Sequence, residues 1–281
     1  MESLKKLIPT QRADRIGLGS ALVLINLVTI NDLITIYDEL TKNSFKSICL
    51  FVIGIFILFN VLGNMFRAIT TDTSIFSNQA PAIQLNEWRY CSICEQYAPP
   101  RSYHCLTCNK CILKRHNHCL FLGKCAGYKN LRFYLLFIFY ILLGTLYSNF
   151  INYNIYLNAL NNISFKTLLM VFVPWFALLI GLVSFKDFFF MFTNTITVIL
   201  FLLMFFYFLI NFKMIINGQT WYEKSKNVCQ KQNRMSNFIE TFGFNWKLAI
   251  IYPFASLKLS GDGTEFTQTN EINNMLNIKS V

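Results

Sequence analysis

Cysteine and histidine are concentrated in one short segment of this 281-residue chain. Seven of the nine cysteines and all three histidines lie between Cys91 and Cys125, and long apolar stretches flank the segment. Histidine has no reason to interleave with cysteines that form disulfides, whereas zinc accepts both residue types and CxxC pairs suit a single ion. The pattern therefore predicts a zinc-binding module carried on a membrane scaffold.

The segment offers more ligands than two zinc ions need. The candidates, in chain order, are Cys91, Cys94, His104, Cys105, Cys108, Cys111, His116, His118, Cys119 and Cys125. Two tetrahedral sites with three cysteines and one histidine each would leave one cysteine and one histidine over. A spare thiol beside two metals is a candidate nucleophile, and the simpler alternative is a zinc ribbon that only folds a loop.

The composition defines the class of protein. The chain is 54% hydrophobic, 16% aromatic and only 14% charged, which is far too apolar for an ordinary soluble domain and predicts an integral membrane protein. About 20 apolar residues cross the hydrocarbon core as a helix. The segments expected on this basis are residues 16–37, 47–65, 133–151 and, within the apolar stretch 165–212, residues 167–185 and 188–212, separated at Lys186 and Asp187.

Basic residues orient these segments. Lysine and arginine are frequent before the first segment, in the cysteine-rich loop and after the last segment, so all three regions are predicted to be cytosolic. An even number of crossings must then separate the cysteine-rich loop from the C-terminal region. The fold class predicted is an all-α multi-pass membrane protein with four transmembrane helices and a small cytosolic zinc-binding, cysteine-rich domain, with residues 167–185 re-entrant or embedded from the luminal side.

The predicted organisation has six parts, and no internal repeat is evident among them. They are a cytosolic N-terminus (1–15), transmembrane helices 1 and 2 (16–66), the cytosolic cysteine-rich zinc domain (67–130), transmembrane helices 3 and 4 with a luminal connection (131–212), a cytosolic C-terminal region (213–259) and a disordered tail (260–281). The net charge of +11 fits this topology and attraction to anionic lipid or nucleotide phosphates. Nucleic acid is not an expected partner, because the zinc module is tethered to the membrane at both ends.

Three motifs resemble one protein family. The string CSICEQYAPPRSYHCLTCNKCILKRHNHCLFLGKCAGYKNLRFY, at 91–134, resembles the cysteine-rich domain of the DHHC protein S-acyltransferases (palmitoyltransferases). Thr220 to Glu223 is similar to the family's TTxE motif, with Trp221 in place of the second threonine. Residues 237–243 resemble its Asn-aromatic C-terminal motif.

The resemblance implies how two structural zinc ions share their ligands. One ion would take Cys91, Cys94, His104 and Cys111, and the other would take Cys105, Cys108, His118 and Cys125. Cys119 and His116 are then the cysteine and the histidine left over.

The resemblance also implies an activity. Cys119 would attack the thioester of a long-chain acyl-CoA such as palmitoyl-CoA, and a cysteine of a cytosolic or membrane protein substrate would then take the acyl group. The zinc ions would serve as scaffold, and the lipid bilayer would hold the enzyme. The expected location is an endomembrane, the endoplasmic reticulum or Golgi, with cytosolic termini.

The chain departs from the family at the motif that gives it its name. Asp-His-His-Cys is replaced by His116, Asn117, His118 and Cys119, so the usual general base is Asn117. His116 is a candidate base if the loop turns it toward Cys119. Three nearby cations could lower the pKa of the thiol or could be plain surface charge: Lys114, Arg115 and Lys124.

Two alternatives from other functional classes remain open. The first is a catalytically weak or inactive relative that acts as a zinc-stabilised binding or chaperone partner. The second, a transporter or channel with a regulatory zinc domain, is disfavoured because the apolar segments lack ionisable residues along a path.

Overall fold

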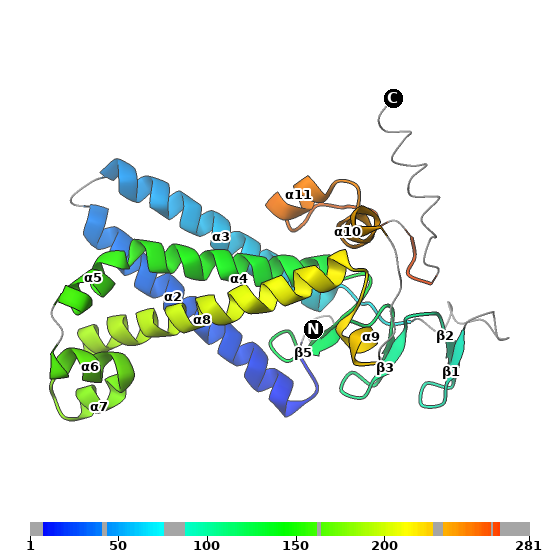
Figure 1. Ribbon diagram of the computed structural model, residues 1–281, viewed down its shortest axis with the longest axis horizontal. Helices are drawn as coiled ribbons and strands as arrows, with labels where there is room; N and C mark the ends of the chain where they lie inside the picture. The colour runs from blue at the N-terminus through cyan, green and yellow to red at the C-terminus, as the bar shows by residue number, and fades with distance from the viewer. Residues whose placement is uncertain are drawn as a thin grey trace. The chain divides into compact units, whose positions relative to one another are not determined.

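The computed structural model describes residues 8–40, 44–75, 88–161, 164–226, 233–259 and 261–264 (Figure 1). The predicted N-terminal charges at 1–7 and most of the predicted tail at 260–281 lie outside these ranges. The chain divides into two compact units. We call Ala21–Val61 with Ile138–Phe208 the membrane unit, and Met1–Ser20 with Leu62–Phe137 and Leu209–Val281 the hairpin unit.

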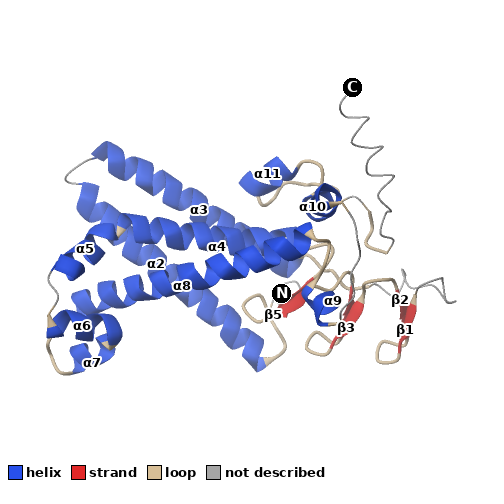
Figure 2. Cartoon of the chain, viewed as in Figure 1, coloured by secondary structure: helices blue, strands red, loops and turns tan. Residues whose placement is uncertain are grey.

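Among the described residues, four helices are long and apolar enough to cross a membrane (Figure 2). They are α2 (Arg12–Leu40), α3 (Ser44–Thr70), α4 (Leu131–Ile151) and α8 (Phe185–Ile216). The shortest has 21 residues, enough to span the roughly 30 Å hydrocarbon core of a bilayer. The chain is therefore a multi-pass helical membrane protein, as its composition predicted.

The apolar stretch 165–212 breaks at a different place from the one predicted. Val173 leaves the helical region with φ −138° and ψ 55° because Pro174 follows it, and Gly181 has φ 71°. Lys186 and Asp187, where we had placed the break, lie in the first turn of α8. The preceding residues form two short helices, α6 (Phe165–Phe172) and α7 (Pro174–Leu179), of about 12 and 9 Å, and neither is long enough to span.

Polar side chains join the helices of the membrane unit. The carboxylate of Asp32 accepts hydrogen bonds from Ser148 Oγ at 2.7 Å and Asn152 Nδ2 at 3.0 Å, which ties α2 to the end of α4. Asn31 Nδ2 donates to Asn194 Oδ1 of α8 at 3.4 Å. Such interhelical hydrogen bonds satisfy polar groups that would otherwise be costly to place among apolar helices. A short helix, α5 (Tyr153–Asn161), follows α4.

In the part of the hairpin unit that the structure describes, there are three antiparallel β-hairpins with strands of three residues each. They are β1 (Arg89–Cys91) with β2 (Gln96–Ala98), β3 (Tyr103–Cys105) with β4 (Lys110–Ile112), and β5 (Asn117–Cys119) with β6 (Lys124–Ala126). After α8, the described residues form three short helices: α9 (Trp221–Ser225), α10 (Arg234–Phe242) and α11 (Trp246–Ile251). Strands this short bury little apolar surface, so the hairpins need other interactions to fix them.

Asn130 is one such interaction, and it joins the last hairpin to two long helices. Its Nδ2 donates to the carbonyl oxygens of Ala68, near the end of α3, and of Cys125 in β6, at 3.0 and 2.9 Å. Its Oδ1 accepts from the backbone N–H of Gly127 at 2.8 Å. Asn130 is buried at the residue before α4, so it fixes where this helix leaves the hairpins.

Candidate active site and metal centres

Eight cysteine and histidine side chains gather into two clusters. The first consists of Cys91, Cys94, His104 and Cys111, and the second of Cys105, Cys108, His118 and Cys125. Within each cluster the ligand atoms lie within 4.8 Å of one another. These are the two sets that the family resemblance implied.

The clusters fit tetrahedral zinc. Nδ1 of His104 lies 3.2, 3.8 and 4.0 Å from the sulfurs of its cluster, and Nδ1 of His118 lies 3.3, 3.6 and 3.8 Å from the sulfurs of the other. In a tetrahedral zinc site with one nitrogen and three sulfur ligands, the nitrogen would lie about 3.5 Å from each sulfur. Four protein ligands leave no open position, so zinc held here would stabilise the hairpins and take no part in the chemistry.

The second cluster has a carboxylate behind its histidine. Nε2 of His118 lies 3.1 and 3.2 Å from the two carboxylate oxygens of Asp14, at the start of α2. This contact fixes the tautomer of His118, because Nε2–H donates to Asp14 and Nδ1 is left as the ligand atom. In contrast, Nε2 of His104 has no hydrogen-bond partner among the described residues. Spacing gave no signal for Asp14, which lies 104 residues from His118.

Replacing Asp14 by asparagine is expected to weaken metal binding at the second cluster about 10- to 100-fold, because the histidine loses its orienting carboxylate. The measurement is the rate of zinc transfer from the purified chain to a chromophoric chelator. One of the two ions should leave faster in the variant. The control is Glu95→Gln, which removes an exposed carboxylate from the first hairpin. Equal release from Asp14→Asn and Glu95→Gln would contradict the prediction.

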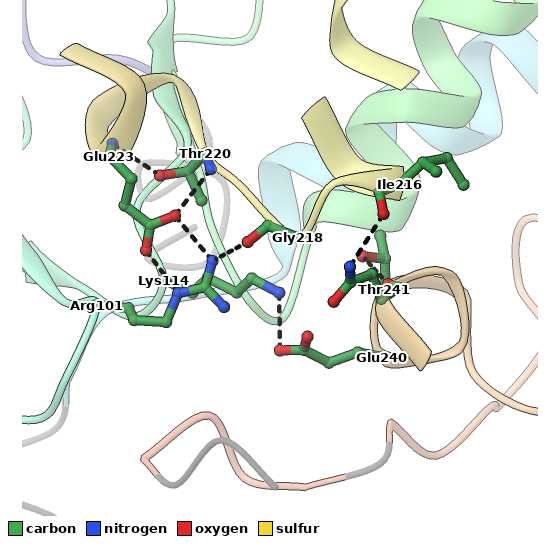
Figure 3. A network of polar contacts seen from close by, with 9 residues as sticks. Arg101, Lys114, Ile216, Gly218, Thr220, Glu223, Glu240 and Thr241 are labelled. Carbon is green, nitrogen blue, oxygen red and sulfur yellow. Dashed lines mark hydrogen bonds and ion pairs between the residues drawn. The ribbon is translucent and has the colours of Figure 1, made fainter. Parts of the chain in front are cut away.

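Buried ion pairs fix the hairpins against the C-terminal region (Figure 3). Arg101 donates from Nε and Nη2 to the two carboxylate oxygens of Glu223, at 2.5 and 2.8 Å, and from Nη2 to the carbonyl of Gly218 at 2.6 Å. Both side chains of this pair are 3% exposed. Nζ of Lys114 lies 2.7 Å from Glu240 of α10, also in a buried pair. Both cations have a left-handed backbone, with φ of 63° and 43°.

Glu223 serves two structures at once. Its backbone N–H donates to Thr220 Oγ1, and its carboxylate accepts from the backbone N–H of Thr220, which makes a capping box at the start of α9. Burial raises the pKa of this carboxyl, but the hydrogen bonds and charge of Arg101 outweigh burial and hold the pKa below its usual value. The TTxE-like motif therefore anchors α9 to the hairpins.

Cys119 lies at the end of β5 and belongs to neither cluster. Its side chain is partly exposed, and the backbone N–H groups of Leu122 and Phe121 hydrogen bond to its sulfur. Burial raises the pKa of the thiol, the two backbone hydrogen bonds oppose this, and the charge of Asp14 raises it further. The thiol is therefore mainly protonated at neutral pH in this structure.

His116 is fully buried, and its side-chain hydrogen bond goes to Asn211 and not to Cys119. Its Nε2 lies 2.9 Å from Asn211 Oδ1 of α8, and the indole N–H of Trp221 donates to the same oxygen at 3.0 Å. Burial lowers the pKa of His116 to about 4, so the imidazole is neutral at pH 7. Nδ1 has no hydrogen-bond partner among the described residues. No hydrogen bond between His116 and Cys119 occurs in the part of the chain that the structure describes.

Asn117 is the motif residue on the same side of β5 as Cys119. Side chains alternate along a strand, so residues 117 and 119 share one face, and residues 116 and 118 share the other. The backbone N–H of His116 bonds to the carbonyl of Ala126, which continues the β5–β6 ladder to this residue. Asn117 Nδ2 donates to the hydroxyl of Tyr134 in α4 at 3.1 Å. An amide therefore stands where a base would face the nucleophile.

The cations near the nucleophile have other partners. Lys114 pairs with Glu240, and Arg115 donates to the carbonyl of His104 at 2.6 Å. Neither Lys114, Arg115 nor Lys124 contributes to the pKa shift of Cys119. The hydrogen bonds of His116 and Trp221 to Asn211 were not predicted either, because Asn211 lies 95 residues from His116 in the chain.

Fold and site together define a class of protein: a multi-pass helical membrane protein with a double Cys3His cluster and one cysteine of the cysteine-rich segment outside it. Comparison with known proteins identifies the family. A family profile described as DHHC palmitoyltransferase matches residues 84–228, just over half of the chain. The chain belongs to the DHHC palmitoyltransferase family.

Individual relatives agree. The chain is 32% identical over 228 residues to "Probable palmitoyltransferase ZDHHC24" of Danio rerio, a match that covers 76% of this chain and 75% of that protein. The protein of the same name from Rattus norvegicus is 31% identical over 219 residues, covering 76% and 77%. The Homo sapiens protein is 30% identical over 228 residues, covering 77% and 78%.

Proposed function

We propose that this chain transfers a long-chain acyl group from acyl-CoA to cysteines of other proteins, with Cys119 as the nucleophile. The observation that carries the proposal is the position of Cys119 in the cysteine-rich segment. It is the cysteine of the segment that both clusters exclude, and it is partly exposed at the end of β5.

Two thioester exchanges make up the proposed reaction. The Cys119 sulfur attacks the acyl carbonyl, the bond between that carbonyl and the CoA sulfur breaks, and CoA leaves as a thiol with the proton that Cys119 gave up. A substrate cysteine then attacks the acyl-Cys119 thioester in the same way and restores the Cys119 thiol. Backbone N–H groups of Phe121 and Leu122 hold the sulfur in place during both steps.

His116 supports the nucleophile from the other side of the strand. Its bond to Asn211 and the bond from the backbone N–H of Tyr222 to its carbonyl fasten the start of β5 to the end of α8 and to α9. We therefore assign His116 a positioning role. A direct role of His116 as the base for Cys119 stays a prediction from the sequence.

The setting of the reaction follows from the membrane helices and the charge pattern. Acyl-CoA such as palmitoyl-CoA is a cytosolic donor, and basic residues flank the hairpins and the C-terminal region, which supports a cytosolic site with both termini on that side. Substrates would be cytosolic or membrane proteins with accessible cysteines. An endomembrane, the endoplasmic reticulum or Golgi, is the proposed location.

Incubation with alkyne-palmitoyl-CoA tests the proposal. The purified chain is expected to acquire a label that hydroxylamine removes, and Cys119→Ser is expected to acquire none, because serine is a far weaker nucleophile toward a thioester. The control is Cys49→Ser, which removes an exposed cysteine of α3 and should label as the wild type does. A wild type without label, while an Asn117→His variant labels, would instead indicate a catalytically silent relative that binds other proteins.

A further inference from the structure

The three hairpins are copies of one unit with a period of 14 residues. Their first strands end at Cys91, Cys105 and Cys119, which pair with Gln96, Lys110 and Lys124 in identical registers. The sequence analysis predicted no internal repeat, and this prediction is therefore wrong. The repeat is hidden because few residue types recur at every copy.

Each hairpin has two places for metal ligands. The turn carries a cysteine pair, Cys91 and Cys94 in the first hairpin and Cys105 and Cys108 in the second. The strands carry a facing pair one residue outside the first cysteine. The facing pairs are Tyr90 with Tyr97, His104 with Cys111, and His118 with Cys125.

The turn pair of one hairpin meets the facing pair of the next. Turn pair 91/94 joins facing pair 104/111, and turn pair 105/108 joins facing pair 118/125. A third metal position would take the turn pair of the last hairpin, Cys119 and Leu122. The residues 14 positions after His118 and Cys125 lie in α4, so this position has no facing pair and only its turn pair could supply ligands. The nucleophile thus occupies a ligand position of this repeat.

The last turn keeps the backbone geometry of the metal-binding turns. The residue after the turn pair has a left-handed backbone in every copy, with φ of 52° at Glu95, 49° at Asn109 and 59° at Gly123. The backbone N–H three residues after the first cysteine also bonds to its sulfur in every copy. The turn pair of the third hairpin therefore differs from the other two at its second position, where a cysteine is replaced by Leu122.

We propose that Leu122 keeps metal away from the nucleophile: the third hairpin is a metal-binding turn that has lost its second thiolate, and this loss leaves Cys119 free to react. Leu122 is 1% exposed, so its side chain fills the place of the missing ligand and excludes water there. The inference rests on the proposed role of Cys119.

Substitution of Leu122 by cysteine tests this directly. The full chain, carrying Cys49→Ser and Cys229→Ser to remove the other unassigned thiols, is equilibrated with micromolar Cd²⁺ under reduction and desalted. Leu122→Cys is expected to retain three ions per chain where the parent retains two. Alkylation of Cys119 by N-ethylmaleimide should slow at least tenfold and recover when a chelator removes the third ion.

Two control variants separate register from side effects. Leu122→Ala shortens the side chain without adding a ligand, and Phe121→Cys adds a thiol one position away. Both variants keep the backbone N–H groups that bond to the Cys119 sulfur, and both are expected to retain two ions. Equal metal content in Leu122→Cys and Leu122→Ala, or a third ion in Phe121→Cys, would overturn the proposal. The proposal would also be overturned if Cd²⁺ slowed the alkylation of Cys119 in the parent protein, because metal would then reach Cys119 although Leu122 is present. The metal content is measured without acyl transfer. A failure of the proposed activity would therefore appear only in the labelling experiment with wild type and Cys119→Ser.

Discussion

Asn117→His is expected to raise the rate at which Cys119 is acylated by about 10²-fold at pH 7, because a positioned base contributes that much to proton transfer. Burial raises the pKa of the Cys119 thiol, so the wild-type protein reacts through a small thiolate fraction. An imidazole at position 117 would stand on the same face of β5 as the sulfur. There it could take the proton as the thioester is attacked.

The contacts of Asn117 favour this substitution. Its amide donates to Tyr134 at 3.1 Å, and its Oδ1 has no partner among the described residues, so the exchange breaks one neutral hydrogen bond. Histidine can donate to the same hydroxyl from one ring nitrogen and present the other to the thiol. The second histidine of the motif, His118, keeps its place in the metal cluster.

The measurement is the initial rate of hydroxylamine-sensitive labelling by alkyne-palmitoyl-CoA. Asn117→Gln is the matched control, because it adds a methylene and keeps the amide, and it should label no faster than the wild type. The reciprocal variant His116→Gln shows whether this histidine is already the base. The prediction would be contradicted if His116→Gln labelled about 10²-fold more slowly than the wild type and Asn117→His labelled no faster. That result would identify His116 as the base.

Glu223→Gln is expected to lower the free energy of unfolding by about 3–5 kcal/mol, because it leaves the Arg101 guanidinium buried without its counter-charge. Glutamine can still cap α9 from the same position, so the substitution isolates the loss of charge. Denaturant titration of the purified protein in detergent micelles measures the change. The hairpins and α9 should come apart first, since this buried pair is one of the contacts that join them.

A double variant and the pH dependence test the cause of this loss. Arg101→Met combined with Glu223→Gln removes both charges, and it should be less destabilised than the sum of the two single variants. Because the folded pKa of Glu223 lies below its unfolded value, the pair contributes fully at neutral pH, and this contribution is lost as the pH falls through the folded pKa. The gap between wild type and Glu223→Gln should therefore narrow below about pH 4. If the losses in free energy of unfolding of the two single variants add up in the double variant, and if the stability difference between wild type and Glu223→Gln does not change with pH, the cause is a packing defect instead.

Periodicity and ligand chemistry made much of this protein predictable. Apolar length located five candidate segments, and the even number of crossings that the basic residues require reduced them to four membrane helices. The break in the apolar stretch 165–212 was misplaced because two charged residues were weighed above Pro174, which separates α6 from α7, and Gly181, which follows α7. A proline limits the backbone of the residue before it, and a charge pair at a helix start does not. Residue type and count indicated two Cys3His sites, because zinc accepts both residue types, whereas the division of the eight residues between the sites came from the family resemblance.

The contacts around the nucleophile were less predictable, since they come from residues far apart in the chain. Asp14 behind His118 and Asn211 behind His116 belong to helices whose sequences carry no motif. Lys114 and Arg115 looked like aids to a thiolate because they are near Cys119 in sequence. Both face other partners, because the loop before β5 turns them toward Glu240 and the carbonyl of His104.

The middle hairpin, β3–β4, belongs to both metal clusters. It gives His104 and Cys111 to one and Cys105 and Cys108 to the other. The first zinc ion to bind would therefore arrange half of the ligands that the second needs, and the second ion would bind more tightly as a result. In a cell short of zinc, such a protein would be divided between empty and doubly filled molecules, and the supply of working enzyme would rise steeply over a narrow range of free zinc.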